Sequence, residues 1–211
     1  MAERSPNREK FCATIQQRAA RYHVSLNEPQ LHQLAAYYEL LERWNPRLHL
    51  VAPCSAREFA TRHVLESLLL LPHLPPDAQL IDIGSGGGLP AIPCLIARPD
   101  LRVMMVESSA RKCVFLREAL RATGGTDQAQ VQATRFEEIA PPPASRYLSC
   151  RALDRFRELL PRLIIWAPRP CTLLLFGGPD LQSDLAAAGR KFTPIPIPDS
   201  ERRLLFVVER D

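Results

Sequence analysis

A cluster of glycines between a strand-like and a helix-like segment constrains this fold more than any other feature of the sequence. Four of the nine glycines lie between Gly84 and Gly88, directly after the apolar segment Gln79–Ile83. The segment Leu89–Ala97 follows, with Pro90 where a first helical turn is expected. Such a turn lets a ligand approach the backbone closely and points the N–H groups of the helix N-terminus at it. We therefore expect a ligand-binding loop at the carboxyl end of a strand in a parallel sheet.

Apolar runs and helical periodicities alternate along the rest of the chain, which predicts a doubly wound α/β fold. The last two strands have no helix between them, so one of them must run antiparallel. The alternating Pro194, Pro196 and Pro198 place the first of these two strands at an edge. The expected strands are Gln79–Ile83, Arg102–Val106, Ala129–Ala133, Tyr147–Cys150, Cys171–Phe176, Lys191–Ile197 and Leu204–Glu209. The expected helices among them are Leu89–Ala97, Ala110–Ala122, Leu153–Trp166 and Asp180–Ala188.

Residues 1–76 have a different character, because helical patterns occur there without strands. Three helices are expected. The second begins with Ser25 as N-cap and Glu28 three residues later, a capping box, and ends at Asn45-Pro46. Its neighbours are expected over Asn7–Tyr22 and Arg57–Leu71. A proline-rich linker, Pro72–Asp77, then divides an N-terminal helical extension (1–76) from the sheet domain (77–211).

Composition excludes several classes of protein. No apolar run approaches the about 20 residues that a membrane span requires, and the N-terminus is polar, so we expect a cytoplasmic protein without a membrane anchor. Six cysteines occur without a C-x-x-C pair, so neither a zinc site nor a disulfide framework is expected, and the histidine spacing suggests no other metal. The net charge of +4, with 24 Arg and 3 Lys against 23 acidic residues, permits an anionic partner.

Two acidic residues indicate which ligand the glycine loop holds. Glu107 follows the expected strand Arg102–Val106, where a carboxylate can accept both hydroxyls of a ribose. The loop reads G-x-G-x-G, with Gly84, Gly86 and Gly88 in the glycine positions, and not the dinucleotide pattern G-x-G-x-x-G. With Asp82 before it, this form suits S-adenosyl-L-methionine. A nicotinamide cofactor and a purely structural glycine loop are the alternatives.

Six short runs of residues carry a wider resemblance. They are Leu41–Asn45, Arg62–Ser67, Ile81–Pro93, Glu107–Leu116, Arg135–Glu138 and Cys150–Ala152. With these runs, nearly the whole chain resembles the GidB-type family of 16S rRNA (guanine-N7) methyltransferases G. The resemblance implies a class I methyltransferase with a Rossmann-like seven-strand sheet, its last strand antiparallel, behind the helical extension. It also implies S-adenosyl-L-methionine as cofactor and 16S rRNA or the 30S subunit as partner, and we expect a monomer.

The resemblance further implies roles for individual residues. Cofactor contacts are expected at Gly84, Leu89, Phe136, Glu137 and Arg151, beside Asp82, Gly86, Gly88 and Glu107 from the loop pattern. Arg151, Arg62 and His63 are expected to line the pocket as catalytic residues that hold a phosphate or the base. Guanine N7 carries a free lone pair, so the enzyme needs to position the base and exclude water and needs no general base. No separate RNA-binding domain fits in the chain, so Arg62, Arg111 and Arg151 should converge at the catalytic face.

Several positions depart from the family pattern. The family usually has Asn-Leu-Thr at His49–Val51, Asp at Glu66 and Glu107, Ser at Cys150 and Lys at Phe176. Loss of that Lys removes an expected phosphate contact. A small-molecule methyltransferase and a non-catalytic, cofactor-binding ribosome-assembly factor are therefore the alternatives. Cys150 also leaves open the methylation of a pyrimidine C5 through a cysteine nucleophile. Such a cysteine normally has a proline directly before it, and Ser149 stands at that position here.

Overall fold

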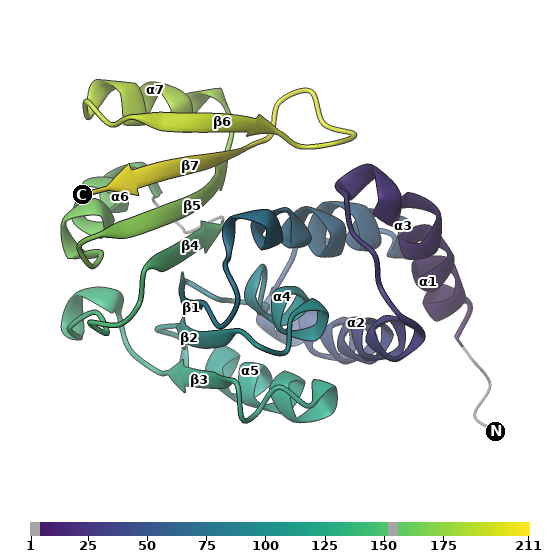
Figure 1. Ribbon diagram of the computed structural model, residues 1–211. Helices are drawn as coiled ribbons and strands as arrows, with labels where there is room; N and C mark the ends of the chain where they lie inside the picture. The colour runs from purple at the N-terminus through teal and green to yellow at the C-terminus, as the bar shows by residue number, and fades with distance from the viewer. Residues whose placement is uncertain (1–4, 152–155) are drawn as a thin grey trace.

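The computed structural model describes residues 5–151 and 156–211 (Figure 1). Within this part of the chain, seven strands form one sheet in the order β3-β2-β1-β4-β5-β7-β6. The strands are β1 (Gln79–Ile83), β2 (Arg102–Val106), β3 (Ala129–Gln132), β4 (Tyr147–Arg151), β5 (Cys171–Gly177), β6 (Phe192–Pro196) and β7 (Leu204–Arg210). Every strand that the sequence predicts is therefore present.

Strand directions follow the predicted pattern. β1 to β5 pair in parallel, β7 runs antiparallel to β5, and β6 pairs antiparallel with β7 at the edge of the sheet. Pro194 and Pro196 lie in β6, where a missing N–H is tolerated because only one side of the strand is paired. The expected α/β fold class, with its last strand antiparallel, is confirmed.

Helices connect the strands and precede the sheet. Those between strands are α4 (Ala91–Ala97), α5 (Ala110–Thr123), α6 (Phe156–Trp166) and α7 (Pro179–Ala187), with a short 3-10 turn η4 (Phe136–Glu138). The expected start of α6 at Leu153 lies outside the described residues. Before the sheet come α1 (Pro6–Arg18), η1 (Ala19–Tyr22), α2 (Glu28–Leu48), α3 (Ala56–Glu58), η2 (Phe59–Leu65) and η3 (Leu68–His73).

The predicted ends of α2 are wrong at both termini. Asn27, and not Ser25, is the N-cap: its side-chain oxygen accepts the N–H of Gln30 at 2.9 Å, and the Gln30 side chain accepts the N–H of Asn27 at 2.9 Å. Pro46 does not end the helix, which continues two residues past it to Leu48. The C-cap His49 adopts the left-handed region with φ 49°.

The predicted third helix is irregular. A single α-helical turn, α3, continues into the π-helix η2, and the 3-10 segment η3 extends past Pro72 to His73. Ser55 caps this segment, because its hydroxyl accepts the N–H of Glu58 at 3.1 Å. A π-helix widens the turn and is frequent at functional sites. Here it turns the backbone carbonyls of Arg62 and His63 toward Arg151.

Apolar side chains form a separate core on each face of the sheet. One core joins α1, α2, η2, η3, α4 and α5 to Leu80, Val103 and Met105 of the sheet. The other joins α6 and α7 to Ile81, Ile83 and Leu148. In Figure 1 the N-terminal helices accordingly lie beside α4 and α5. The expected boundary between residues 76 and 77 stays a prediction, since the first core runs across it.

None of the described helices is both long enough and apolar enough to cross a membrane.

Leu34 tests whether the N-terminal helices fold together with the sheet. This side chain is fully buried in the core that α2 shares with α4 and α5. Leu34→Ala should lower the free energy of unfolding by about 2–5 kcal/mol, because it leaves a cavity in that core. Circular dichroism and thermal denaturation should show one transition for helices and sheet together.

Ile165→Ala is the matched control, because Ile165 is 74% exposed. Its free energy of unfolding should stay within about 0.5 kcal/mol of the parent chain. Two separate transitions, with only the first shifted by Leu34→Ala, would contradict a shared core.

Candidate functional site

A cleft of about 1080 Å³ opens at the carboxyl ends of β1, β2 and β4. From β1, the strands β2 and β3 continue in one direction and the strands β4 and β5 in the other. Ligands of doubly wound sheets usually bind at this switch point. Of the predicted site residues, those that line the cleft are His63, Gly84, Gly86, Leu89, Glu107, Phe136, Glu137 and Arg151.

The glycine loop adopts conformations that require glycine. Gly84, Gly86 and Gly88 have φ angles of 69°, 51° and 83°, in the left-handed region. A Cβ on Gly88 would collide with the Ile92 side chain, 2.8 Å from Cγ1. Gly88 therefore supports the loop from behind and does not line the cleft. The three glycines of the G-x-G-x-G pattern thus occupy the three loop positions that have a positive φ angle.

Glu107 joins the glycine loop to the neighbouring strand end. One carboxylate oxygen accepts the N–H of Gly86 at 2.9 Å, and the other accepts the N–H of Ser109 at 2.7 Å. Each oxygen retains a second lone pair, and the side chain lies at the cleft wall. The position fits the predicted acceptor of two ribose hydroxyls.

Asp82 does not line the cleft, in contrast to the prediction that it contacts the cofactor directly. It alternates with Ile81 and Ile83 on β1, so its side chain points to the opposite face of the sheet, where it is fully buried. The Ser149 hydroxyl donates to Oδ1 at 2.7 Å, and Oδ2 has no hydrogen-bond partner among the described residues. Burial raises the pKa of Asp82 to about 7, against the lowering effect of the Ser149 hydrogen bond.

Aromatic and charged side chains also line the cleft. Phe136 packs edge-to-face on Trp166, with ring centroids 5.6 Å apart, and lines the cleft with an apolar surface that suits an adenine ring. Glu137 forms an ion pair with Arg162 at 3.1 Å. The apolar ring surface, the Glu107 carboxylate and the open loop backbone together fit an adenine nucleoside.

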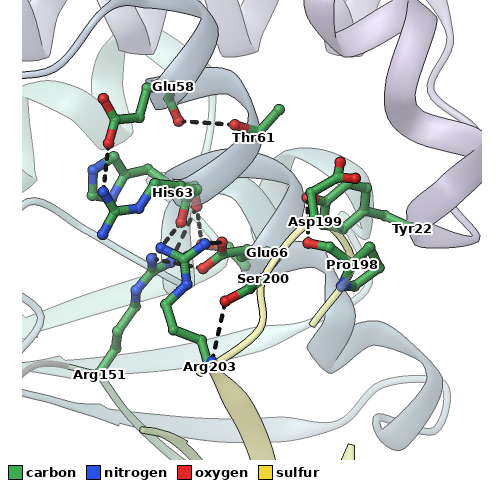
Figure 2. A network of polar contacts seen from close by, with 12 residues as sticks. Tyr22, Glu58, Thr61, His63, Glu66, Arg151, Pro198, Asp199, Ser200 and Arg203 are labelled. Carbon is green, nitrogen blue, oxygen red and sulfur yellow. Dashed lines mark hydrogen bonds and ion pairs between the residues drawn. The ribbon is translucent and has the colours of Figure 1, made fainter. Parts of the chain in front are cut away.

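Arg151, at the end of β4, also lines the cleft. Figure 2 shows its guanidinium beside Glu66 and Arg203. Its guanidinium donates to the backbone carbonyls of Arg62 and His63 and to the Ser67 hydroxyl, and it pairs with Glu66 at 3.3 Å. Burial lowers the pKa of Arg151, and the Glu66 carboxylate opposes that shift. Phe176 packs against this guanidinium, 5.3 Å from ring centroid to Cζ. The residue that stands where the family has Lys therefore makes a cation–π contact.

His63 lies beside Arg151 and lines the cleft. Burial and the surrounding arginines lower its pKa to about 3, so its imidazole is neutral at physiological pH. Glu66, which is not among the predicted site residues, is 1% exposed and pairs with both Arg151 and Arg203. The sequence signal for it was its place in the run Arg62–Ser67, one of the runs that carry the family resemblance.

The expected convergence of Arg62, Arg111 and Arg151 is wrong for the first two. The Arg62 side chain forms an ion pair with Glu58, one turn earlier, and neither Arg62 nor Arg111 is among the residues that line the cleft. Lys112, Arg135 and Arg162 take this position instead. Lys112 lines the cleft and Arg111 does not, because side chains of consecutive residues on the helix α5 point about 100° apart.

Cys150 is fully buried and is not among the cleft-lining residues, which argues against its use as a nucleophile. Among residues 5–151 and 156–211, no group of three or more His, Cys, Asp or Glu side chains is placed to hold a metal ion.

Known proteins resemble the chain in sequence. The family model GidB, described as rRNA small subunit methyltransferase G, matches residues 30–186. The ribosomal RNA small subunit methyltransferase G of Chromobacterium violaceum is 36% identical over 148 residues, which is 70% of either chain. The protein of the same name from Xanthomonas axonopodis pv. citri is 46% identical over 127 residues, or 60% of this chain and 59% of the relative.

Solved structures resemble the chain in fold. The mitomycin 7-O-methyltransferase MmcR has a TM-score of 0.60 at 14% identity, covering 98% of this chain and 69% of that one. A SAM-dependent methyltransferase from Aquifex aeolicus has a TM-score of 0.57 at 13% identity, covering 82% and 97%. At these identities the likeness concerns the fold alone.

The buried Asp82 predicts a pH dependence of stability. Its pKa rises from 3.8 to about 7 on folding, so the folded state binds a proton more readily than the unfolded state between these values. The stabilisation associated with this proton is present below pH 4 and is lost as the pH rises through about 7. The free energy of unfolding of the parent chain, minus that of Asp82→Asn, should therefore fall from pH 4 to pH 7 and then level off.

Chemical denaturation at a series of pH values measures this difference. Asp127→Asn, which removes an exposed carboxylate, is the control for the loss of one acidic side chain. A parent-minus-Asp82→Asn difference that is constant from pH 4 to pH 8 would be incompatible with the raised pKa.

Proposed function

The chain belongs to the GidB family, the small-subunit rRNA methyltransferases G, and on this premise we propose that it transfers a methyl group from S-adenosyl-L-methionine to N7 of a guanine in 16S rRNA. The observation that carries the proposal is the cleft itself, which is lined by the glycine loop and Glu107 and also by His63 and Arg151. The first pair suits an adenine nucleoside. The second pair forms a wall against which an acceptor base can lie.

Different residues of the cleft would contact different parts of the cofactor. The Glu107 carboxylate would accept the ribose hydroxyls while its present bonds hold the loop. Phe136 and Leu89 would enclose the adenine, with Glu137 near its polar edge. Gly84 and Gly86 expose backbone to the cleft, and Gly88 and Asp82 act from outside it. Arg151 offers a cation for a carboxylate or phosphate.

When bound, the cofactor supplies an electrophilic methyl group on a sulfonium. The protein has no proton to remove, because guanine N7 presents a lone pair without one. Its residues therefore act by positioning the base and excluding water. His63 is neutral and packs against the Phe59 ring, with ring centroids 5.2 Å apart, so it can contact a base without adding charge. Arg151 is fixed by several acceptors and keeps its direction.

Cations that line the cleft fit a nucleic-acid acceptor. Lys112, Arg135 and Arg162 are among its lining residues and could contact phosphate groups that flank the target base. We propose a monomer acting on the 30S subunit. Such an acceptor requires the compartment that contains ribosomal subunits, which we take to be the cytoplasm.

Methyl transfer to 30S subunits tests the proposal directly. With labelled S-adenosyl-L-methionine, subunits and nucleoside digestion, the label should appear in 7-methylguanosine. Glu107→Ala should reduce kcat/KM by roughly tenfold to hundredfold, because it removes a charged acceptor of hydrogen bonds. The exposed Glu201→Ala is the matched control. Cofactor binding by calorimetry without label in guanine would contradict the proposal, and label in a pyrimidine would support the cysteine mechanism.

The pH profile tests the role of His63. Because its pKa lies near 3, the imidazole does not change charge in the physiological range. Between pH 6 and pH 8, kcat should vary by less than about twofold in the parent chain and in His63→Gln. An inflection near pH 6.5 that disappears in His63→Gln would show that this histidine titrates during turnover.

A further inference from the structure

The loop between β6 and β7, residues 197–203, reaches across the molecule to the N-terminal helices (Figure 2). The Tyr22 hydroxyl donates to the carbonyl of Pro198 at 3.1 Å, and Arg18 and Arg21 pair with Asp199 at 2.7 and 2.8 Å. Burial, with a smaller effect of Asp199, raises the pKa of Tyr22 to about 12, so the phenol stays a donor. The loop is thereby fixed against the first helical segment.

Arg203 stands at the end of this loop and points into the protein. Its N–H donates to the Ser200 hydroxyl at 3.1 Å, and its carbonyl accepts the N–H of Ile197 at 3.3 Å. These bonds close the loop. The Arg203 guanidinium then lies 2.7 Å from Oε1 of Glu66.

Glu66 is shared between two arginines. Its side chain is 2% exposed, with Oε1 toward Arg203 at 2.7 Å and Oε2 toward Arg151 at 3.3 Å. Burial raises the pKa of Glu66, while the two arginines favour its ionised form. Oε2 accepts a hydrogen bond from Arg151, whereas the contact of Oε1 with Arg203 is an ion pair without hydrogen-bond geometry. The carboxylate therefore lies between the two guanidinium groups, and Arg203 acts on its orientation through charge.

The charges of this cluster do not balance. Arg151 and Arg203 share one carboxylate, Arg62 pairs with Glu58, and His63 is neutral. Asp82 is a further carboxyl group near Arg151, and its raised pKa of about 7 leaves it only partly ionised at neutral pH. A net positive charge therefore remains in the cluster, and Arg151, which lies farther from the Glu66 carboxylate than Arg203 does, is the member that lines the cleft.

We propose that Arg203 is a positioning residue, which holds Glu66 so that Arg151 keeps a fixed direction and presents the net positive charge of the cluster to an anionic group in the cleft. That group is a carboxylate or a phosphate, brought by the cofactor or by the acceptor. The identification of these ligands rests on the proposed function, whereas the orientation of Arg151 does not. Arg203 and Asp199 lie outside the matched residues 30–186, so the support comes from a part of the chain that the family model does not cover.

The side-chain resonances of Arg151 report its orientation in the full-length chain. In ¹⁵N-labelled protein, the Nε–Hε signal, assigned with Arg151→Lys, should be sharp and slowly exchanging. Arg203→Ala should broaden it or speed its hydrogen exchange on the order of tenfold, and Arg203→Lys should restore part of the protection. Arg202→Ala, which removes an exposed cation from the same loop, should leave it unchanged. An unchanged Arg151 signal in folded Arg203→Ala would overturn the proposal.

A double-mutant cycle tests the consequence for function. Calorimetry with S-adenosyl-L-methionine and methyl transfer to 30S subunits should show that Arg203→Ala weakens whichever parameter Arg151→Ala weakens, by on the order of tenfold. In the Arg151→Ala background, Arg203→Ala should have no further effect. Additive effects would mean that Arg203 acts only through stability and would refute the proposal. Should Arg203→Ala not fold, Arg203→Gln and Glu66→Gln complete the same cycle.

The two proposals fail in different ways. If the parent chain methylates no rRNA, the proposed function is wrong, and the resonance comparison still decides the role of Arg203. If rRNA is methylated at guanine N7 but Arg203→Ala and Arg202→Ala behave alike, the positioning role alone is wrong.

Discussion

The carboxylate of Glu107 joins the two strand ends on which the whole cleft depends. By accepting the N–H groups of Gly86 and Ser109, it fixes the glycine loop after β1 to the start of α5 after β2. The carbonyl of Val106 adds bonds from Gly84 and Ser85. A loop with three residues in the left-handed region has few internal bonds of its own, so these contacts hold its backbone open toward the ligand. One side chain thus serves both the shape of the site and its chemistry.

The N-terminal helices contribute to the site through buried polar contacts. The Tyr37 hydroxyl donates to the carbonyl of Gly87 at 2.5 Å from within α2, and the π-helix supplies carbonyls to Arg151. Burying a charge is costly unless it is paired and hydrogen-bonded. The pairing of Glu66 therefore draws together β4, the π-helix and the loop after β6, which are far apart in the chain. The N-terminal helices are therefore part of the cleft, because they hold its glycine loop and Arg151.

Local patterns predicted the sheet well and the helix ends poorly. The strands follow from short apolar runs between glycine or proline turns, and the proline-rich β6 had to be an edge. By contrast, Ser25 and Asn27 are both good caps by propensity, and Asn27 is the one that forms a reciprocal capping box with Gln30. The site shows the same division: the glycines and Glu107 were predicted to line or support the cleft, whereas Asp82, Arg62 and Arg111 point elsewhere.

By itself, the sequence determined the features that depend on backbone chemistry and on order along the chain. These are the left-handed glycine positions after β1, the carboxylate at the end of β2 and the antiparallel final strand. The tertiary structure alone decided which side chains meet. It buried Asp82 within the sheet, turned the Arg62 carbonyl and not its guanidinium toward Arg151, and brought Arg203 to Glu66. Side-chain direction depends on packing between distant segments, and no local pattern encodes it.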